Sequence, residues 1–145
     1  MRRTDVVARE VRIRARPETV FEFFTDPEKM TRWKGIGAEL DARPGGAYRI
    51  QVSPRDVAVG EYVEIDRPRR IVVTWGWEGD EIVPPGTSTV EVTFTGEGDE
   101  TVVRVEHRDL PEGAGAVHAE GWEHFLPRLA TAAAGGDPGA DPWAQ

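Results

Sequence analysis

Short runs in which hydrophobic and polar residues alternate cover most of the chain between residues 6 and 107. Val11 and Ile13 alternate with arginines, and later runs, most with the same period of two, lie at 38–42, 48–52, 57–65, 71–77, 90–94 and 103–107. A period of two is typical of strands that bury one face. Segments containing Gly, Pro or Asp at 43–46, 66–68 and 96–99 separate the runs. The pattern therefore predicts strands joined by short turns.

Three segments carry helical signals instead. Pro17 and the pair Asp26-Pro27 suit the first turns of two short helices, the second of which should reach about Trp33. From residue 116 to 134 the apolar residues recur at helical spacing, and Gly135-Gly136 marks the end of this helix. One face of the long helix then carries His118, Trp122, Phe125, Leu126 and Leu129.

The resulting order is one strand, two short helices, six strands and one long helix, which predicts an α+β domain with an antiparallel sheet. When one face of such a sheet is solvated, the other must be covered, and the long helix is the available cover. We assign residues 1–136 to a single domain and 137–145 to a loop-like C-terminal tail. We expect Trp143 of the tail to pack against the body of the protein.

Composition narrows the classes of function. The chain has 145 residues, no cysteine and a net charge of −8. The lack of cysteine excludes disulfides, thiolate metal sites and thiol nucleophiles, and the acidic balance argues against a nucleic-acid partner. The N-terminal residues show no apolar segment of a signal peptide, and no apolar run could span a bilayer. We therefore expect a soluble cytoplasmic protein that does not insert into membranes.

The spacing of polar residues does not match known metal or nucleophile motifs. His118 and His124 are six positions apart, so they point to different sides of a helix. Gly45-Gly46 is not followed by the Lys of a phosphate-binding loop, and neither serine lies in a nucleophile elbow. We expect no metal and no other cofactor.

A series of short motifs resembles one known family. The series consists of Thr25-Asp26-Pro27-Glu28 with Trp33, Arg43-Pro44-Gly45-Gly46, the segment 60–65 with Pro68 and Arg70, Thr74-Trp75, Thr101, Glu106-His107, His118 and Gly121-Trp122. In order and spacing it is similar to proteins of the activator-of-Hsp90-ATPase-homologue (AHSA1-like) branch of the START-like, or SRPBCC, superfamily. The resemblance spans residues 11–134, and the tail resembles that of bacterial members.

The resemblance implies a helix-grip (START/Bet v 1-like) fold. In this fold a six-stranded curved antiparallel sheet wraps around a long C-terminal helix, and two short helices after the first strand close one end. A mostly apolar cavity lies between sheet and helix. Related branches bind lipids, sterols, plant hormones or polyketide intermediates, and some act as cyclases, so the fold alone does not identify a ligand.

In such a fold we expect ligand-binding residues on the inner strand faces and on the long helix. The candidates are Trp33, Tyr48, Ile50, Glu61, Val63, Trp75, Trp77, His107, His118, Trp122, Phe125 and Leu129. The aromatic residues among them would line a slot for a planar or lipid-like ligand, although aromatic residues at these positions also suit a packed core.

We assign no catalytic residue, but Glu61 and His107 are candidates. Glu61 shares a strand face with Val59 and Val63, so it is a buried carboxylate if that face points inward and a solvated one at a bulge or edge. His107 and His118 either contact a ligand or are polar core residues whose hydrogen bonds are satisfied.

Three hypotheses of function follow. The first, which we favour, is a binding protein, monomeric or weakly dimeric, whose cavity takes a hydrophobic, aromatic or polyketide-like small molecule. The second is a cyclase or dehydratase that acts on polyketide-type substrates in the same cavity, which needs an inward acid/base pair. The third is an interaction module resembling an Hsp90 activator, which predicts a filled interior. We expect a binding protein rather than an enzyme.

Overall fold

The computed structural model describes residues 3–145, so the first two residues of the predicted domain lie outside the described part. The elements are β1 (Thr4–Ile13), α1 (Pro17–Glu22), α2 (Pro27–Met30), β2 (Gly37–Leu40), β3 (Ala47–Gln51), β4 (Val57–Asp66), β5 (Arg70–Trp77), β6 (Ser88–Glu97), β7 (Glu100–Pro111), α3 (Gly115–Ala133) and the 3₁₀ turn η1 (Pro142–Ala144). This is the order of strands and helices that the alternation of residues predicts. Within residues 3–145, no helix has both the length and the apolar content required to cross a bilayer.

All strands join one antiparallel sheet with the order β1-β7-β6-β5-β4-β3-β2. The sheet has seven strands, so the expectation of six, which came from the family resemblance, is wrong. One edge of the sheet is the short strand β2, which pairs with β3. Its four residues are enough to continue the hydrogen-bond ladder because β3 supplies a regular partner.

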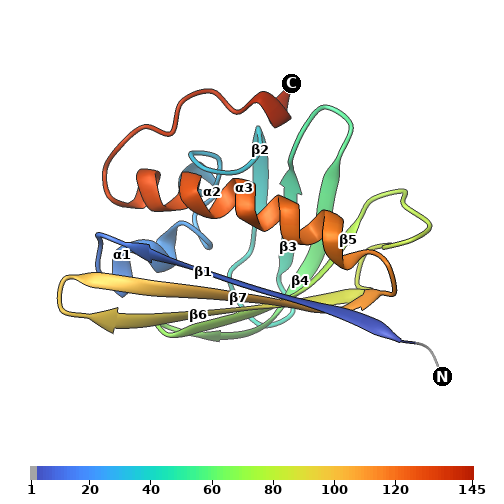
Figure 1. The fold of residues 1–145 in the computed structure, drawn as a ribbon, viewed down its shortest axis with the longest axis horizontal. Helices are drawn as coiled ribbons and strands as arrows, with labels where there is room; N and C mark the ends of the chain where they lie inside the picture. The colour runs from blue at the N-terminus through green and yellow to red at the C-terminus, as the bar shows by residue number, and fades with distance from the viewer. Residues whose placement is uncertain (1–2) are drawn as a thin grey trace.

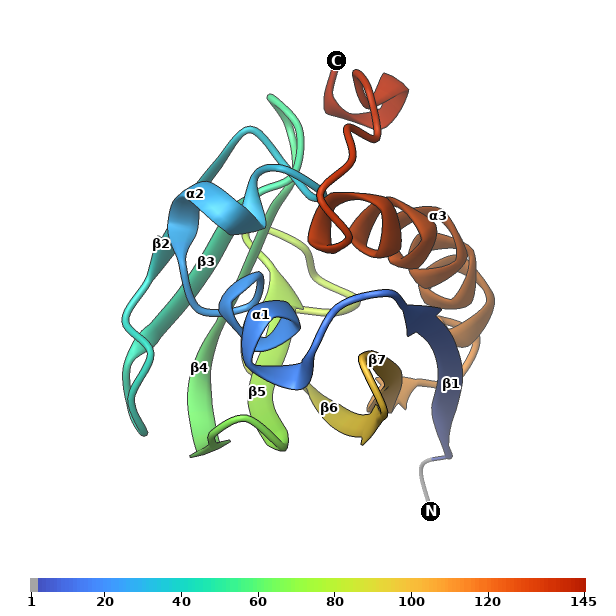
Figure 2. The same ribbon diagram turned by 90° about the vertical axis from the view of Figure 1, so that its left-hand side faces the viewer.

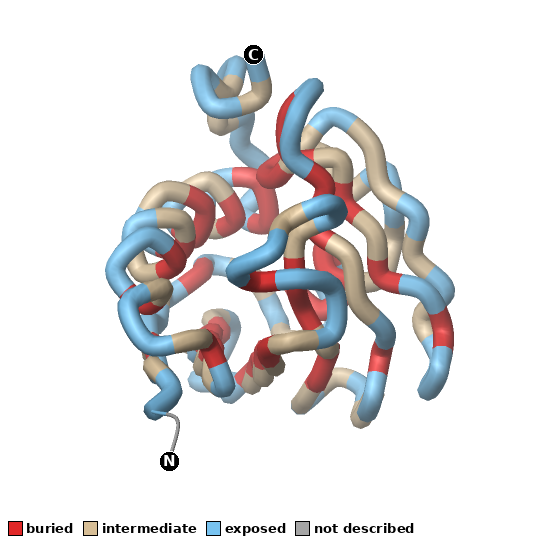
Figure 3. Tube along the Cα trace, turned by 90° about the vertical axis from the view of Figure 1, so that its right-hand side faces the viewer, coloured by how far each residue is buried: buried red, intermediate tan, exposed pale blue. Residues whose placement is uncertain are grey.

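The sheet is curved, and α3 lies across its concave side (Figure 1). Seen at right angles, the strands form an open trough, with α1 in the opening at one end and α3 beside β1 (Figure 2). Buried residues recur along the strands and along α3 (Figure 3), and together they form one hydrophobic core. The predicted helix-over-sheet arrangement is therefore confirmed.

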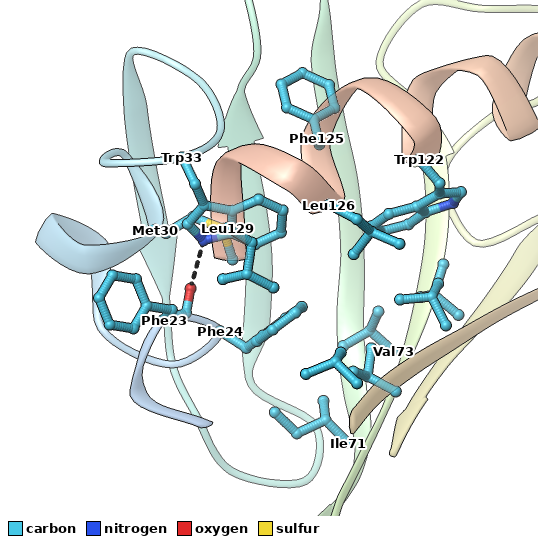
Figure 4. Packing of buried hydrophobic residues seen from close by; sticks show 14 of the residues in the cluster. Phe23, Phe24, Met30, Trp33, Ile71, Val73, Trp122, Phe125, Leu126 and Leu129 are labelled. Atoms are coloured by element: carbon cyan, nitrogen blue, oxygen red, sulfur yellow. Dashed lines mark hydrogen bonds between the residues drawn. The ribbon is translucent and has the colours of Figure 1, made fainter. Parts of the chain in front are cut away.

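The apolar face predicted for the long helix is buried. Trp122, Phe125, Leu126 and Leu129 of α3 are all buried. In Figure 4, Leu126 and Leu129 extend from α3 into the core, while the Phe125 ring lies on the other side of the helix. Trp33, which follows α2, is fully buried against this face, and its indole N–H donates to the carbonyl of Phe23 at 3.0 Å. Both ends of the indole are thus satisfied, one by apolar contact and one by a hydrogen bond.

The short helices begin where the sequence predicts. Pro17 is the first residue of α1, and the Asp26 side chain accepts hydrogen bonds from the backbone N–H groups of Glu28 and Lys29 at the start of α2. The second helix ends at Met30 rather than at about Trp33. The residues that follow it turn toward the sheet and reach the site described below.

Glu61 and Val63 of β4 do not point into the trough, so their assignment to an inner strand face is wrong. Both residues are exposed, whereas Tyr62 between them is buried and donates its hydroxyl to the carbonyl of Phe24 at 2.8 Å. The register of β4 against β5 shifts between Tyr62 and Glu64. This bulge reverses the alternation, so that Ala58 is buried before it and Ile65, opposite Ile71, packs on the core after it. The solvated alternative for Glu61 is the correct one.

Leu129→Ala should destabilise the fold strongly because Leu129 is fully buried between α3 and the sheet. We expect the free energy of unfolding to fall by about 2–5 kcal/mol, measured by urea denaturation followed by circular dichroism. Glu120→Ala on the exposed side of the same helix is the control and should change stability by less than about 0.5 kcal/mol. Equal stabilities of the two variants would show that α3 does not pack as described.

Candidate functional site

A cavity of about 440 Å³ lies between α3, β5 and the C-terminal tail. This volume is within the range of about 300–1,000 Å³ typical of small-molecule sites. Its walls are mainly aromatic and apolar. The lining residues are Lys34, Val52, Asp56, Trp75, Trp77, Val117, His118, Gly121, Trp122, Phe125, Pro142, Trp143 and Gln145.

One wall is fixed by hydrogen bonds that run from α3 into the sheet. The indole N–H of Trp122 donates to Nδ1 of His107 at 3.2 Å, and Nε2 of His107 lies 2.8 Å from the hydroxyl of Ser88. An indole N–H can only donate, so Nδ1 of His107 accepts and its Nε2 carries the proton. The Ser88 hydroxyl in turn donates to the carbonyl of Trp75 at 2.9 Å. The chain connects α3 to β7, β6 and β5.

A second pair of the same kind lies nearer the start of α3. The indole N–H of Trp77 donates to Nε2 of His118 at 3.0 Å. Nδ1 of His118 lies 2.8 Å from the carbonyl of Ala114, one helical turn earlier, and donates to it. Each histidine therefore holds one tryptophan of the cavity wall in a fixed orientation.

Neither histidine is available as a general acid or base in this arrangement. Both ring nitrogens of His107 and of His118 are already hydrogen-bonded. Burial, with smaller contributions from the nearby His118 and Lys34, lowers the pKa of His107 to about 3. His107 is consequently neutral at physiological pH, as its role as an acceptor for Trp122 requires. Of the two alternatives for His107 and His118, the structure agrees with polar core residues whose hydrogen bonds are satisfied within the protein.

The most unusual group in the cavity is Lys34, which is buried. Its Nζ lies 4.1 Å from the centroid of the Trp75 ring, 4.6 Å from that of Trp122 and 5.0 Å from that of Phe125. Burial lowers the pKa of Lys34 to about 7, because the charged amine loses its hydration. The ring faces partly compensate through cation–π attraction.

The chain around Lys34 is held from both sides. Gly35 has a φ of +86°, and a Cβ there would lie 2.6 Å from the carbonyl oxygen of Gln51 on β3. Only glycine allows the chain to approach β3 so closely. On the other side, Nε of Arg128 on α3 donates to the carbonyl of Trp33 at 3.1 Å. These two contacts place Lys34 between sheet and helix.

The C-terminal tail covers one side of the cavity and confirms the expected packing of Trp143. Trp143 stacks on His124 of α3 with ring centroids 3.9 Å apart, and His124 Nε2 lies 2.8 Å from Oδ1 of Asp141. Arg128 donates to the carbonyls of Pro138 and Gly139. The tail runs back over α3, as Figure 1 shows, so that its last turn borders the cavity.

The predicted site residues fall into three groups. Five line the cavity: Trp75, Trp77, His118, Trp122 and Phe125. Five others are buried in the core around it: Trp33, Tyr48, Ile50, His107 and Leu129. Glu61 and Val63 are exposed on β4 and do not line it.

Tyr48 packs edge-on against Tyr62 and also contacts Trp75. Burial raises the pKa of Tyr48, so its hydroxyl is a neutral core group.

Lys34 is the most important cavity residue that the sequence interpretation missed. The other lining residues that were not among the candidates are Val52, Asp56, Val117, Gly121, Pro142, Trp143 and Gln145. A lysine beside a tryptophan at the end of a short helix gives no periodic signal. One signal was present, since the chain uses arginine almost throughout and has lysine only at positions 29 and 34. The open space at Gly121 was also missed, since the absence of a side chain on a helix face is visible only when its neighbours are placed.

Comparison with known proteins agrees with this architecture. The model of the family "Activator of Hsp90 ATPase homolog 1-like protein" matches residues 14–134. The search of curated proteins gives no match.

Several solved structures are similar. An AHSA1-like protein of Rhizobium etli is 42% identical, with a TM-score of 0.77 over 99% of this chain and 90% of that one. DynU16, from the dynemicin biosynthetic locus, is 26% identical with a TM-score of 0.79, over 92% of this chain and 49% of that one. An HSP90 activator of Plasmodium falciparum is 26% identical with a TM-score of 0.70, over 86% of this chain and 92% of that one. The chain therefore belongs to the activator of Hsp90 ATPase homologue 1-like family, as its motifs indicate.

Proposed function

We propose that this protein binds a small, largely apolar molecule in the cavity between β5, α3 and the tail. The observation that carries the proposal is the cavity itself, whose wall consists of Trp75, Trp77, Trp122 and Phe125. Two of these indoles are held by histidines, so the wall keeps its shape without a ligand. A preformed apolar site of this kind loses little conformational entropy on binding.

The cyclase or dehydratase alternative has less support. It needs an inward acid/base pair, but Glu61 is exposed and the histidines are fully hydrogen-bonded. Asp56 is the only carboxylate side chain of residues 3–145 that lines the cavity, and it is exposed on the loop between β3 and β4, while the terminal residue Gln145 brings its α-carboxylate to the tail side. DynU16 comes from a biosynthetic locus, which is compatible with a binding role as well as with a catalytic one.

The chaperone-activator alternative predicts a filled interior, and a cavity of about 440 Å³ argues against it. The large exposed apolar residues of the described chain come from separate segments and do not by themselves mark a docking surface. They are Val6, Ile36, Val63, Ile82, Val117 and Trp143. A cytoplasmic location and a monomeric or weakly dimeric state stay predictions from the sequence.

Gly121→Leu should close the cavity without disturbing the fold. A Cβ at Gly121 would meet no atom within 4 Å outside its own stretch of helix, so the new side chain would extend into the empty space. With the neutral fluorescent probe N-phenyl-1-naphthylamine, we expect saturable binding to the wild type and a loss of affinity of about tenfold or more in this variant. Thermal unfolding should show no loss of stability, since glycine inside a helix is itself unfavourable.

Glu120→Leu is the matched control for that experiment. Glu120 precedes Gly121 but is exposed and does not line the cavity, so this variant adds the same side chain outside it. It should bind the probe like the wild type. Equal binding by both variants would place the probe elsewhere, and no saturable binding to the wild type would contradict the proposed function.

Trp143→Ala should open the side of the cavity that the tail covers. Trp143 borders the cavity and stacks on His124, so its removal loosens the tail as well as the wall. We expect the probe to dissociate about threefold faster or more in stopped-flow experiments, with a smaller change in melting temperature. Ala140→Ser, at an exposed tail position away from the cavity, is the control. An unchanged dissociation rate would show that the tail does not limit release.

A further inference from the structure

The amine of Lys34 is a polar group at the inner wall of an otherwise aromatic site. It lies over the faces of Trp75 and Trp122 and near Phe125, and the side chain is only 3% exposed. Among residues 3–145, no carboxylate forms an ion pair with it, and no atom accepts a hydrogen bond from its Nζ. The two lysines of the chain differ in this respect, because Lys29 is paired with Glu22.

Few other charged or titratable groups face this amine. His107 on β7 and His118 on α3 are neutral partners of tryptophans. Asp56 is exposed at the rim and accepts a hydrogen bond from Ser53, and Gln145 also lines the cavity and carries the terminal carboxylate. The β-sheet and α2 supply no carboxylate within 4.0 Å of the amine in the described chain. No carboxylate of residues 3–145 therefore forms an ion pair with Lys34 within 4.0 Å.

The buried polar groups of the cavity wall that have no partner among residues 3–145 are donors. Besides the amine of Lys34, the indole N–H of Trp75 is buried and has no acceptor among residues 3–145. A buried donor without a partner costs free energy, and a ligand that brings an acceptor to the amine of Lys34 recovers part of that cost. An anionic acceptor also supplies the missing counter-ion in a site of low dielectric, where the attraction is strong.

We propose that Lys34 is the recognition group for an acidic function on the ligand, so that the cavity selects aromatic or aliphatic carboxylic acids over neutral molecules of the same shape. The inference rests on the proposed function, since it concerns what the same cavity binds. The amine and the acid form one ion pair, and the apolar part of the ligand lies against Trp77, Trp122 and Phe125. The three ring faces stabilise the ammonium form, which favours an acid over a carbonyl compound that would need the free amine as a nucleophile.

Calorimetric titration with 2-naphthoate and its neutral methyl ester tests this inference. At pH 6 the wild type should bind naphthoate about tenfold more tightly than the ester, or better, as expected for a hydrogen bond between charged groups. Lys34→Met removes the amine but keeps an unbranched apolar side chain. This variant should lose that preference, while its affinity for the ester stays within about twofold. Lys29→Met, which removes the other lysine outside the cavity, should behave like the wild type.

The affinity for naphthoate should also fall as the pH rises. Because burial lowers the pKa of Lys34 to about 7, the free protein loses the ammonium above that pH while naphthoate remains an anion. Between pH 6 and pH 9 the affinity should decrease more than about tenfold in the wild type. In Lys34→Met the decrease should vanish, which assigns it to Lys34 rather than to His107, His118 or Asp56.

Lys34→Met should fold, because it removes a buried charge. The folded-state pKa of Lys34 lies below the unfolded value of about 10.4, so the wild type becomes more stable as the pH rises from 7 toward that value. The variant should therefore have the higher melting temperature, most clearly below pH 7, and its advantage should shrink above it.

The outcomes separate this inference from the proposed function. If wild type and Lys34→Met bind acid and ester alike, or if the preference for the acid persists in the variant, the inference is wrong and the cavity remains a binding site. If neither compound binds the wild type at any pH tested, both are overturned.

Discussion

The position of α3 over the sheet depends on the hydrogen bonds that connect Trp122, His107 and Ser88. Apolar packing alone would let the helix slide or settle closer, because it has little directionality. A buried indole donor and a neutral imidazole acceptor fix both distance and rotation, and each would be left unsatisfied if the helix moved. With α3 held in this way and no side chain at Gly121, the space beside Trp122 is a cavity rather than packed core.

The same constraint explains the chemistry of the cavity wall. Histidines that accept from tryptophans must be neutral, so His107 and His118 add little charge to the site. The buried positive charge of the site is therefore that of Lys34. Its burial costs free energy, and no ion pair with another residue of 3–145 offsets that cost. A feature that opposes stability and yet is held in place by Gly35 and Arg128 is typical of a functional group.

Membership of the family determines the fold more firmly than it determines the ligand or partner. The relatives include a protein from a biosynthetic locus and an HSP90 activator, although their folds are alike. In this chain the distinguishing features lie in a few side chains of the trough. Those side chains are aromatic rings in fixed orientations, one amine and a tail that covers one side of the cavity.

The sequence by itself determined the elements and most of the buried faces. Alternation placed Trp75 and His107 on the inner faces of their strands, and helical spacing placed Trp122 beside His118, because these patterns are local. Other features depend on contacts between distant segments. The bulge in β4 that turns Glu61 outward is visible only from its pairing with β5. The burial of Lys34 depends on the contact of Gly35 with β3 and on the hydrogen bond from Arg128 to Trp33. The tail contacts the site through His124. Tertiary structure decided these three features because burial and strand register depend on which segments lie next to each other. The local pattern of residues does not specify those neighbours.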